Sequence, residues 1–491
     1  MIGSAILGIT LLAEMQAQSP VRTYEPTWES LKQYTTAEWF RDAKFGIFIH
    51  WGVYSVPAFG SEWYPREMYI QGGDVFKHHV ATYGPQAKFG YKDLIPLFKA
   101  EKWDPVHWAD VFKRSGARYI VPVAEHHDGF AMYKTALSPW NAVAMGPKRD
   151  IIGELASAVR AQGLVFGLSS HRAEHWWFMD GGRKFDSDVR DPAYAGLYGP
   201  ALPDSIPPSR EYLEDWYARC KELIDSYHPQ LFWFDWWIER PAFVPYLQKF
   251  ASYYYDQGLA WNKEVVVNYK NVAFPDNTAV LDIERGRLKT IRELPLQTDT
   301  SVGKKSWGYI EGEENKSADE LIDILVDIVS KNGCLLLNIG PRADGTIPEQ
   351  QEQTLLDMGA WLAVNGEAIY GSRPWKIFGE GVTAENEGMF SENKSQPYTA
   401  QDIRFTSKGD SVYAICLGWP GDAMWVKNIR PGEGTKIFML GYDKPLAWEW
   451  VNGKGLRVVL PEALQRDDAR PCGYAYTFRV EGAVLPGGGG N

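Results

Sequence analysis

From about residue 27 to residue 375, short runs of consecutive apolar residues alternate with longer segments whose apolar residues recur at helical spacing. Residues 231–234 form the clearest run, Leu-Phe-Trp-Phe without polar alternation, so both faces of this strand should be buried. Strands of this kind belong to parallel sheets that helices cover. Seven further runs predict strands at 45–52, 117–127, 164–171, 265–270, 279–284, 296–300 and 334–340.

Several of the intervening segments carry helical signals. Residues 150–160 and 210–228 have apolar residues at helical spacing, and Ser317 with Glu320 forms a capping box before a helix that continues to Ser330. About eight strands with helical crossovers are typical of a (β/α)8 barrel. We therefore predict a TIM-like catalytic barrel over residues 19–375.

The pattern changes after residue 375, where short strand-like segments replace the helical spacing. Asn452-Gly453 lies between two of them and indicates a hairpin. We predict a small C-terminal β-sandwich over residues 376–485 and a flexible, glycine-rich tail over 486–491. The strand-like segments are at 403–406, 411–416, 436–440, 447–451, 456–460 and 474–480.

The first residues of the chain have a pattern of their own. Residues 2–13 are mostly apolar, and Ala17 follows shortly after. This run is too short to span a bilayer as a helix but fits the apolar core of a secretory signal. We predict a signal peptide over residues 1–18 and a secreted or periplasmic protein; an amphipathic or buried first helix is the alternative. No other stretch is long enough to cross a membrane.

The amino-acid composition indicates which classes of binding partner are expected. A net charge of −11 argues against nucleic acid as a partner. The 21 Trp and 26 Tyr residues supply flat rings that suit the faces of sugars, although tryptophan is also ordinary core material. Of the four scattered cysteines, Cys334 and Cys416 are expected to be buried thiols, and a Cys416–Cys472 disulfide is the alternative.

Polar residues gather where the predicted strands end, which is the face on which barrels carry their active sites. Asp235 ends the aromatic run, and a carboxylate among aromatic rings is either partnered or used in chemistry. A structural role as the cap of the next helix is the alternative. The other polar residues at strand ends are His50, His126, His127, Ser170, His171, Lys270 and Glu284.

The histidine pattern does not favour a metal site. Zinc-dependent barrel hydrolases usually carry two histidines one residue apart on the first strand, whereas His50 stands alone. His126 and His127 are adjacent, so on an extended strand they would point to opposite sides. We therefore predict no metal and no cofactor.

Several motifs together resemble glycoside hydrolase family 29, the α-L-fucosidases. The resemblance covers about residues 39–375 and implies a retaining, two-step hydrolysis of terminal α-L-fucosyl linkages in oligosaccharides or glycoconjugates. It does not indicate an oligomeric state. The motifs are residues 39–57 as the opening strand, Ser-Glu-Trp-Tyr at 61–64, Glu-His-His-Asp-Gly-Phe at 125–130, Phe-Trp-Phe-Asp at 232–235, Ser-Trp-Gly-Tyr at 306–309, Leu-Leu-Asn-Ile-Gly-Pro at 336–341 and residues 367–375 as the barrel exit.

The resemblance also implies roles for individual residues. Asp235 matches the nucleophile that forms a covalent glycosyl-enzyme. A second carboxylic acid protonates the leaving oxygen and later deprotonates water. The residues expected to hold the sugar are His50, Glu62, Trp63, His126, His127, His171, Trp233, Lys270 and Trp307.

The acid/base is the least determined of these roles. Glu284 ends an apolar run and precedes Arg285-Gly286, which resembles an acid-then-glycine pattern in some family members. We predict Glu284, with Glu293 as the runner-up; Asp282 and Asp299 are the other carboxylates of this region.

Two departures from the family pattern bear on specificity. Ser170 and His171 stand where many members carry tyrosines, and Lys270 stands where an arginine is frequent. Lysine is a point donor rather than a planar fork, so an L-galactoside-like or arabinoside-like substrate stays an alternative. A non-catalytic fucose-binding lectin and a metal-dependent hydrolase are the alternatives from other classes.

Overall fold

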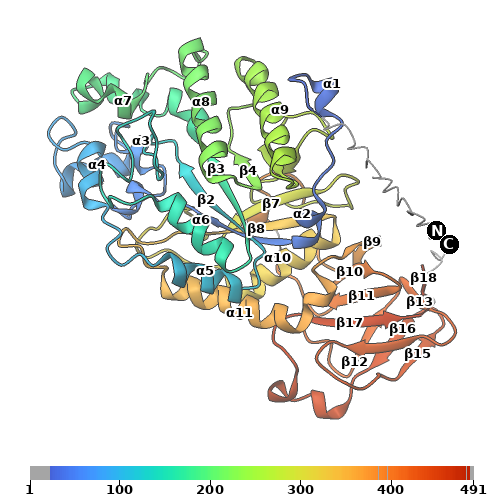
Figure 1. The fold of residues 1–491 in the computed structure, drawn as a ribbon. Helices are drawn as coiled ribbons and strands as arrows, with labels where there is room; N and C mark the ends of the chain where they lie inside the picture. Colours follow the sequence, from blue (N-terminus) through green and yellow to red (C-terminus); the bar gives the residue numbers. More distant parts are fainter. Residues whose placement is uncertain (1–22, 385, 395, 483, 487–491) are drawn as a thin grey trace, which may run out of the picture.

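A computed structural model describes residues 23–384, 386–394, 396–482 and 484–486. Eight parallel strands close into a barrel in which β1 pairs with both β2 and β8, so the predicted barrel is confirmed (Figure 1). The predicted signal peptide lies outside the described residues. The barrel strands are β1 (Phe45–Ile49), β2 (Tyr119–Glu125), β3 (Val165–Ser170), β4 (Leu231–Phe234), β5 (Val266–Lys270), β6 (Val280–Asp282), β7 (Leu296–Ser301) and β8 (Gly333–Ile339).

Helices cover the outside of the barrel (Figure 1). The three helices predicted from spacing and capping are present as α6, α8 and α10, and Ser317 with Glu320 forms the expected capping box. The long helices are α5 (Pro105–Arg114), α6 (Ile151–Ala161), α8 (Arg210–Tyr227), α9 (Val244–Ala260), α10 (Ala318–Ser330) and α11 (Glu349–Asn365); the shorter ones are α1 (Trp28–Leu31), α2 (Glu38–Ala43), α3 (Tyr64–Glu67), α4 (Asp74–Thr82) and α7 (Ala195–Tyr198).

Two connections differ from the regular βα pattern. The described residues 271–279, between β5 and β6, and 283–295, between β6 and β7, contain no helix. The barrel therefore lacks part of its helical cover next to the end of β6. A segment of the C-terminal domain lies against this side, because Arg287 and Gly388 form a β-bridge.

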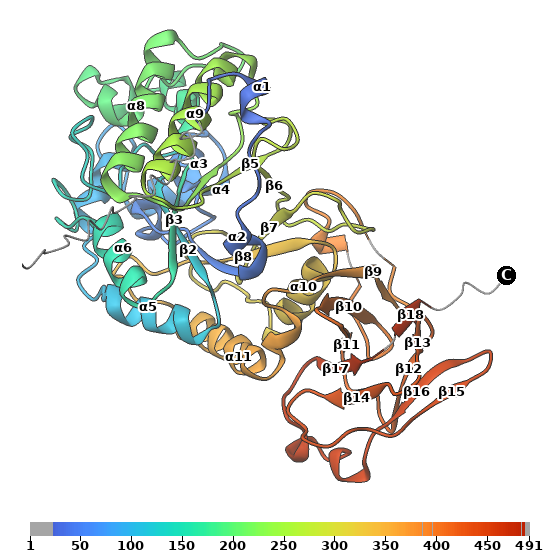
Figure 2. The same cartoon turned by 45° about the vertical axis from the view of Figure 1, so that its right-hand side comes forward.

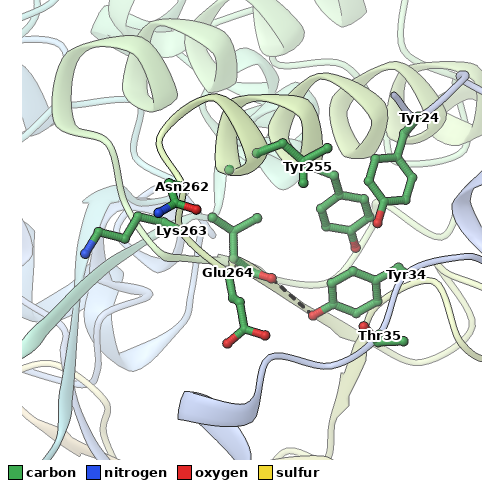
Figure 3. Close-up of a pocket in the computed structure, with 10 residues that line it drawn as sticks. Tyr24, Tyr34, Thr35, Tyr255, Asn262, Lys263 and Glu264 are labelled. Carbon is green, nitrogen blue, oxygen red and sulfur yellow. Dashed lines mark hydrogen bonds between the residues drawn. The ribbon is translucent and has the colours of Figure 1, made fainter. Parts of the chain in front are cut away.

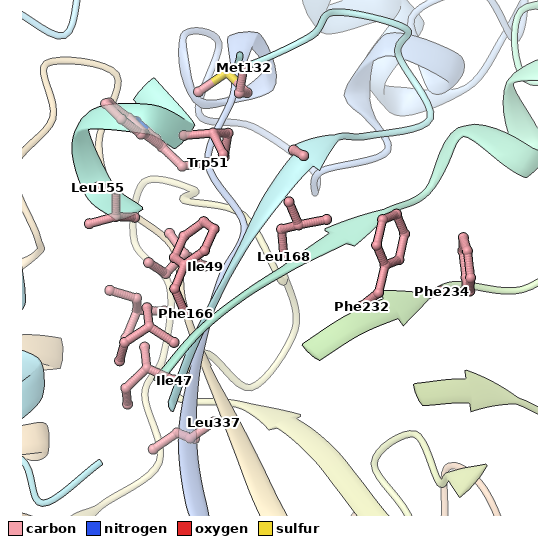
Figure 4. Close-up of a cluster of buried hydrophobic side chains, with 14 of the residues drawn as sticks. Ile47, Ile49, Trp51, Met132, Leu155, Phe166, Leu168, Phe232, Phe234 and Leu337 are labelled. Carbon is pink, nitrogen blue, oxygen red and sulfur yellow. The ribbon is translucent and has the colours of Figure 1, made fainter. Parts of the chain in front are cut away.

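Alternate residues of each strand serve two apolar layers, which explains the continuous apolar runs. Ile47, Phe166 and Phe232 point outward into the layer between strands and helices (Figure 4). Phe48 and Trp233, one residue further along their strands, belong to a second apolar cluster inside the barrel. Both faces are buried, as the sequence predicts, and the inner cluster forms the base on which polar residues at the strand ends rest.

The C-terminal domain is built from antiparallel strands around its own apolar core, beside α10 and α11 (Figure 2). A five-stranded sheet in the order β14-β17-β11-β10-β9 is accompanied by the sheets β12-β16-β15 and β13-β18. The strands are β9 (Arg373–Glu380), β10 (Ile403–Lys408), β11 (Ser411–Cys416), β12 (Ala423–Val426), β13 (Ile429–Pro431), β14 (Lys436–Met439), β15 (Trp448–Val451), β16 (Gly455–Val459), β17 (Tyr476–Glu481) and β18 (Val484–Pro486).

Details of this domain refine the sequence expectations. The predicted hairpin is present, with Gly453 at φ 77° between β15 and β16. The expected boundary at 375/376 falls inside β9, and Pro486, placed in the expected tail, pairs with Ile429. All four cysteines are free thiols, so the structure does not contain the alternative disulfide. Among the described residues, none of the helices has the length and apolarity that a membrane span requires.

Candidate active site

A cleft of about 260 Å³ opens at the carboxyl ends of the barrel strands. This volume is below the roughly 300–1,000 Å³ usual for drug-sized ligands, so it suits a ligand as small as one sugar. The cleft is lined by His50, Glu62, Trp63, His126, His127, His171, Glu174, Trp233, Asp235, Trp236, Glu284, Asp299, Trp307 and Phe390.

The cleft brings together all the predicted site residues except two. Lys270 is fully buried beneath it, and Glu293 is exposed in the connection between β6 and β7 and does not line it. Four lining residues were not among the predicted site residues: Glu174, Trp236, Phe390 and Asp299, the last named from the sequence only as another carboxylate of the region.

A second cleft, of about 340 Å³, lies at the start of β5, at the opposite ends of the strands (Figure 3). Tyr34 stacks on Tyr255 there, with ring centroids 4.5 Å apart, and its hydroxyl donates to the carbonyl of Val265. Glu264 is the only carboxylate of this lining. Because glycoside hydrolysis needs a pair of carboxyl groups, the catalytic candidate is the cleft at the carboxyl ends.

Asp235 follows β4 directly and is held by two histidines. Its Oδ2 lies 3.1 Å from His171 Nδ1 and 3.3 Å from His127 Nε2. Burial by itself raises the pKa of Asp235, but the two histidines outweigh it and hold this pKa well below its ordinary value. Asp235 is therefore an ionised carboxylate, and its other oxygen, Oδ1, is not engaged by these histidines.

The hydrogen-bond partners of His127 and His171 determine which ring nitrogens carry a proton. His127 Nδ1 lies 2.9 Å from the carbonyl oxygen of His171, and Nε2 faces Asp235, so both nitrogens must donate. Despite burial, Glu174 and Asp235 raise the pKa of His127 to about 9, in agreement with an imidazolium. His171 lies 3.1 Å from Ser169 Oγ through Nε2, and burial lowers its pKa. His171 is thus a neutral ring that donates to Asp235 from Nδ1.

His126 and His127 both face the cleft, which corrects the expectation that they point apart. β2 ends at Glu125, so the strand alternation does not extend to these residues, and their ring centroids lie 4.2 Å apart. His126 Nδ1 is buried without a hydrogen-bond partner. His50 Nδ1 lies 2.7 Å from Asn338 Oδ1, which leaves His50 Nε2 for a ligand. Burial lowers the pKa of both His50 and His126, so these neutral rings can accept hydrogen bonds from hydroxyl groups.

The convergence of histidines also creates candidate metal ligands. His50, His126 and His171 offer ring nitrogens within 4.8 Å of one another, as do the side chains of His127, His171 and Asp235. Both nitrogens of His171 are already engaged, and His127 donates from both of its nitrogens. The arrangement therefore suits hydroxyl groups better than a cation, and the absence of a metal stays a prediction.

Glu62 and Trp307 form another wall of the cleft. Glu62 Oε2 accepts hydrogen bonds from the backbone N–H of Trp307 at 2.9 Å and from Ser306 Oγ at 3.1 Å. Burial raises the pKa of Glu62, although these donors oppose the change. Since Oε2 is occupied, Oε1 is the oxygen that can accept from a ligand hydroxyl.

Lys270 lies below the cleft among three carboxyl groups. Its Nζ is 2.7 Å from Asp299, 3.2 Å from Asp282 and 3.4 Å from Glu284. Burial and the neighbouring Asp282 raise the pKa of Asp299 well above its ordinary value, so Asp299 holds a proton. Lys270, expected to contact substrate, is instead placed to position Glu284 from beneath.

Glu284 follows β6 and is held from two sides. Its Oε2 accepts from Trp236 Nε1 at 2.6 Å and pairs with Lys270, while its backbone carbonyl accepts from the N–H of Phe390. These contacts fix the carboxyl group at the edge of the cleft that also contains Asp235.

Glu174 is a third carboxyl group of the cleft. It lies in the short 3-10 helix Arg172–Trp176 after β3, is 3% exposed, and its Oε2 has no hydrogen-bond partner. Burial raises its pKa to about 8; His127 opposes this, and Asp235 adds to it. No strand pattern marks this residue, because it lies in a short 3-10 helix beyond the end of β3.

Comparisons with known proteins agree with this geometry. Residues 11–367 match the family profile described as Alpha-L-fucosidase, and residues 396–481 match the profile Alpha-L-fucosidase C-terminal domain. An alpha-L-fucosidase of Branchiostoma floridae is 33% identical, covering 97% of this chain and 100% of that protein. The tissue alpha-L-fucosidase of Homo sapiens is 33% identical, covering 94% of this chain and 93% of that protein.

Solved structures lead to the same family. The alpha-fucosidase of Thermotoga maritima in complex with a mechanism-based inhibitor superposes with a TM-score of 0.76 at 32% identity, covering 94% of this chain and 100% of that chain. The same enzyme in complex with fucose gives a TM-score of 0.74, covering 93% and 100%. The chain therefore belongs to the α-L-fucosidase family.

Proposed function

We propose that the protein is a retaining α-L-fucosidase that releases terminal α-L-fucosyl residues from fucosylated oligosaccharides or glycoconjugates. The observation that carries this proposal is the pair of carboxyl groups in one sugar-sized cleft. Asp235 is kept ionised by two histidines, and Glu284 is held at the edge by Trp236 and Lys270. Retaining glycosidases need such a pair, one as nucleophile and one as proton donor.

In the first step, Oδ1 of Asp235 attacks the anomeric carbon while Glu284 transfers its proton to the glycosidic oxygen. The bond between the anomeric carbon and the glycosidic oxygen breaks, and a β-linked fucosyl ester on Asp235 forms. In the second step, Glu284 takes a proton from water, and the resulting hydroxide attacks the anomeric carbon. Asp235 leaves as a carboxylate, and the sugar is released with its original α configuration.

The remaining lining residues account for sugar recognition. His50 and His126 accept from hydroxyl groups, Glu62 accepts through Oε1, and His127 carries a positive charge next to the nucleophile. Trp63, Trp233 and Trp307 supply apolar faces for the C–H groups of the ring. His171 supports this recognition indirectly by orienting Asp235.

The assignment of the nucleophile predicts the behaviour of Asp235→Ala. Turnover should fall by on the order of 10⁴-fold or more, because the covalent step is lost. The wild-type protein, inactivated with a 2-fluoro-fucosyl fluoride and digested for mass spectrometry, should carry the label on Asp235. A label on any other residue would overturn the assignment.

The assignment of the acid/base predicts a different pattern for Glu284→Ala. Activity on glycans should fall by roughly 10²–10⁴-fold, with a smaller loss on aryl fucosides that have good leaving groups, because these need little protonation. Added azide should restore turnover and give α-fucosyl azide, since it intercepts the β-linked intermediate. Glu293→Ala is the matched control and should behave as wild type; azide rescue of Glu293→Ala instead would transfer the role to Glu293.

The raised pKa of Glu174 predicts a pH-dependent effect on stability. The pKa rises from its ordinary value of 4.5 to about 8 on folding, so ionisation opposes folding as pH rises above about 4.5, and the penalty is complete above about 8. Glu174→Gln removes this penalty and should raise the free energy of unfolding relative to wild type at pH 8, by a few kcal/mol at most, but not at pH 4. Denaturant unfolding at both pH values checks this, with Glu293→Gln as the exposed control. An equal effect at pH 4 and pH 8 would contradict the raised pKa.

We further propose that the protein is exported, which rests on the apolar residues 2–13 alone. N-terminal sequencing of protein from its native host should find a mature chain that begins near residue 18. An intact Met1 in the cytoplasmic fraction would refute export.

A further inference from the structure

The mouth of the cleft contains an aromatic residue from the C-terminal domain. Phe390, in the connection between β9 and β10, is 51% exposed although it lines the cleft. Its ring lies nearly parallel to that of Trp236, with an interplanar angle of 11° and centroids 6.3 Å apart. Phe390 is the exposed ring of this pair, and Trp236 is partly buried, so the two rings form an aromatic edge at the mouth of the cleft.

The two rings flank the proposed proton donor. Trp236 donates from its indole Nε1 to Glu284 Oε2, and the backbone N–H of Phe390 donates to the carbonyl of Glu284. The glycosidic oxygen must reach Glu284 to receive its proton. The group attached to that oxygen therefore passes next to Phe390 and Trp236.

The segment that carries Phe390 is fastened to the barrel at several points. Gly388 exchanges backbone hydrogen bonds with Arg287, and the backbone N–H of Glu392 donates to the carbonyl of Arg285. Glu392 also pairs with Lys316 Nζ at 2.7 Å. These contacts use the side of the barrel where the connection between β6 and β7 has no helix, so the C-terminal domain completes the mouth here.

Three residues near the cleft mouth have left-handed backbone conformations. Phe390 has φ 56°, Arg285 has φ 41° and Trp237 has φ 80°, all in the left-handed region that bulky residues avoid. Such conformations are unfavourable for bulky residues and persist where the surrounding structure enforces them. The backbone of Phe390 is thus held in this conformation while about half of the residue's surface remains exposed.

We infer that Phe390 and Trp236 form the subsite for the leaving group, and that this group is a pyranose sugar with an apolar C–H face. This inference rests on the proposed function, because it assumes that fucose fills the inner cleft. A cleft of about 260 Å³ has room for one sugar, so a second ring extends over the mouth. A flat pair of aromatic rings suits the C–H face of a pyranose and gives little to a small or flexible alcohol.

The test compares a substrate with a second ring and one without. For each variant, kcat/KM is measured on α-L-fucosyl fluoride and on α-L-fucosyl pyranosides linked 1→2, 1→3, 1→4 and 1→6. The kcat/KM for the best pyranoside is then divided by the kcat/KM for the fluoride. Phe390→Ala should lower this ratio about fivefold to tenfold, which is the usual size of one ring contact. Phe390→Leu should lower this ratio similarly, because the flat face is lost. Phe390→Tyr keeps the flat face and should give the wild-type ratio.

The control and the outcomes separate this inference from the proposed function. Trp425→Ala removes another exposed aromatic ring of the C-terminal domain, on β12, and should leave the ratio unchanged. A wild-type protein that fails to cleave fucosyl fluoride would refute the fucosidase proposal itself. If the wild type cleaves it, an unchanged ratio in Phe390→Ala and Phe390→Leu, or an equal loss on both substrates, would overturn the leaving-group subsite.

Discussion

The proposed reaction depends on keeping the largely enclosed carboxylate of Asp235 ionised. Asp235 is surrounded by aromatic side chains, and a carboxyl group in such a place would ordinarily hold its proton and lose its nucleophilicity. His127 prevents this, because the carbonyl of His171 and the carboxylate of Asp235 require both of its nitrogens to donate. The loop after β2 must leave the extended conformation at residue 126 so that this imidazolium can face β4.

The second carboxyl group of the reaction has a different environment. Glu284 accepts a hydrogen bond from the neutral indole of Trp236. It shares Lys270 with Asp282 and Asp299, and Asp299 holds a proton. Lys270 is shared among three carboxyl groups, whereas the imidazolium of His127 and an N–H of neutral His171 both face the single carboxylate of Asp235. Two carboxyl groups in different surroundings can take the opposite roles of nucleophile and proton donor, which is how glycosidases divide the reaction.

The sequence predicts most of this arrangement, because the signals are local. Continuous apolar runs reveal strands buried on both faces, and Asp235 is conspicuous where the run at 231–234 ends. Prediction is less successful where the chain leaves regular structure. Strand alternation separates His126 from His127 only if β2 continues past Glu125, and it does not.

Residues that reach the cleft from irregular segments give no such signal. Glu174 lies in a short 3-10 helix after β3, and Phe390 lies more than one hundred residues after Glu284 and Trp236, which it adjoins, in a different domain. Spacing along the chain cannot reveal that the C-terminal domain contributes to the mouth. The connections on both sides of β6 contain no helix, which leaves this side of the barrel open to the C-terminal domain.

The central claim is that hydrolysis proceeds by two displacements through Asp235. The anomeric configuration of the first product tests this most directly, since two inversions retain configuration and one inverts it. Proton NMR during rapid hydrolysis of an aryl α-L-fucoside should show α-L-fucose first, with the β anomer appearing later by mutarotation. Initial appearance of β-L-fucose would contradict the account.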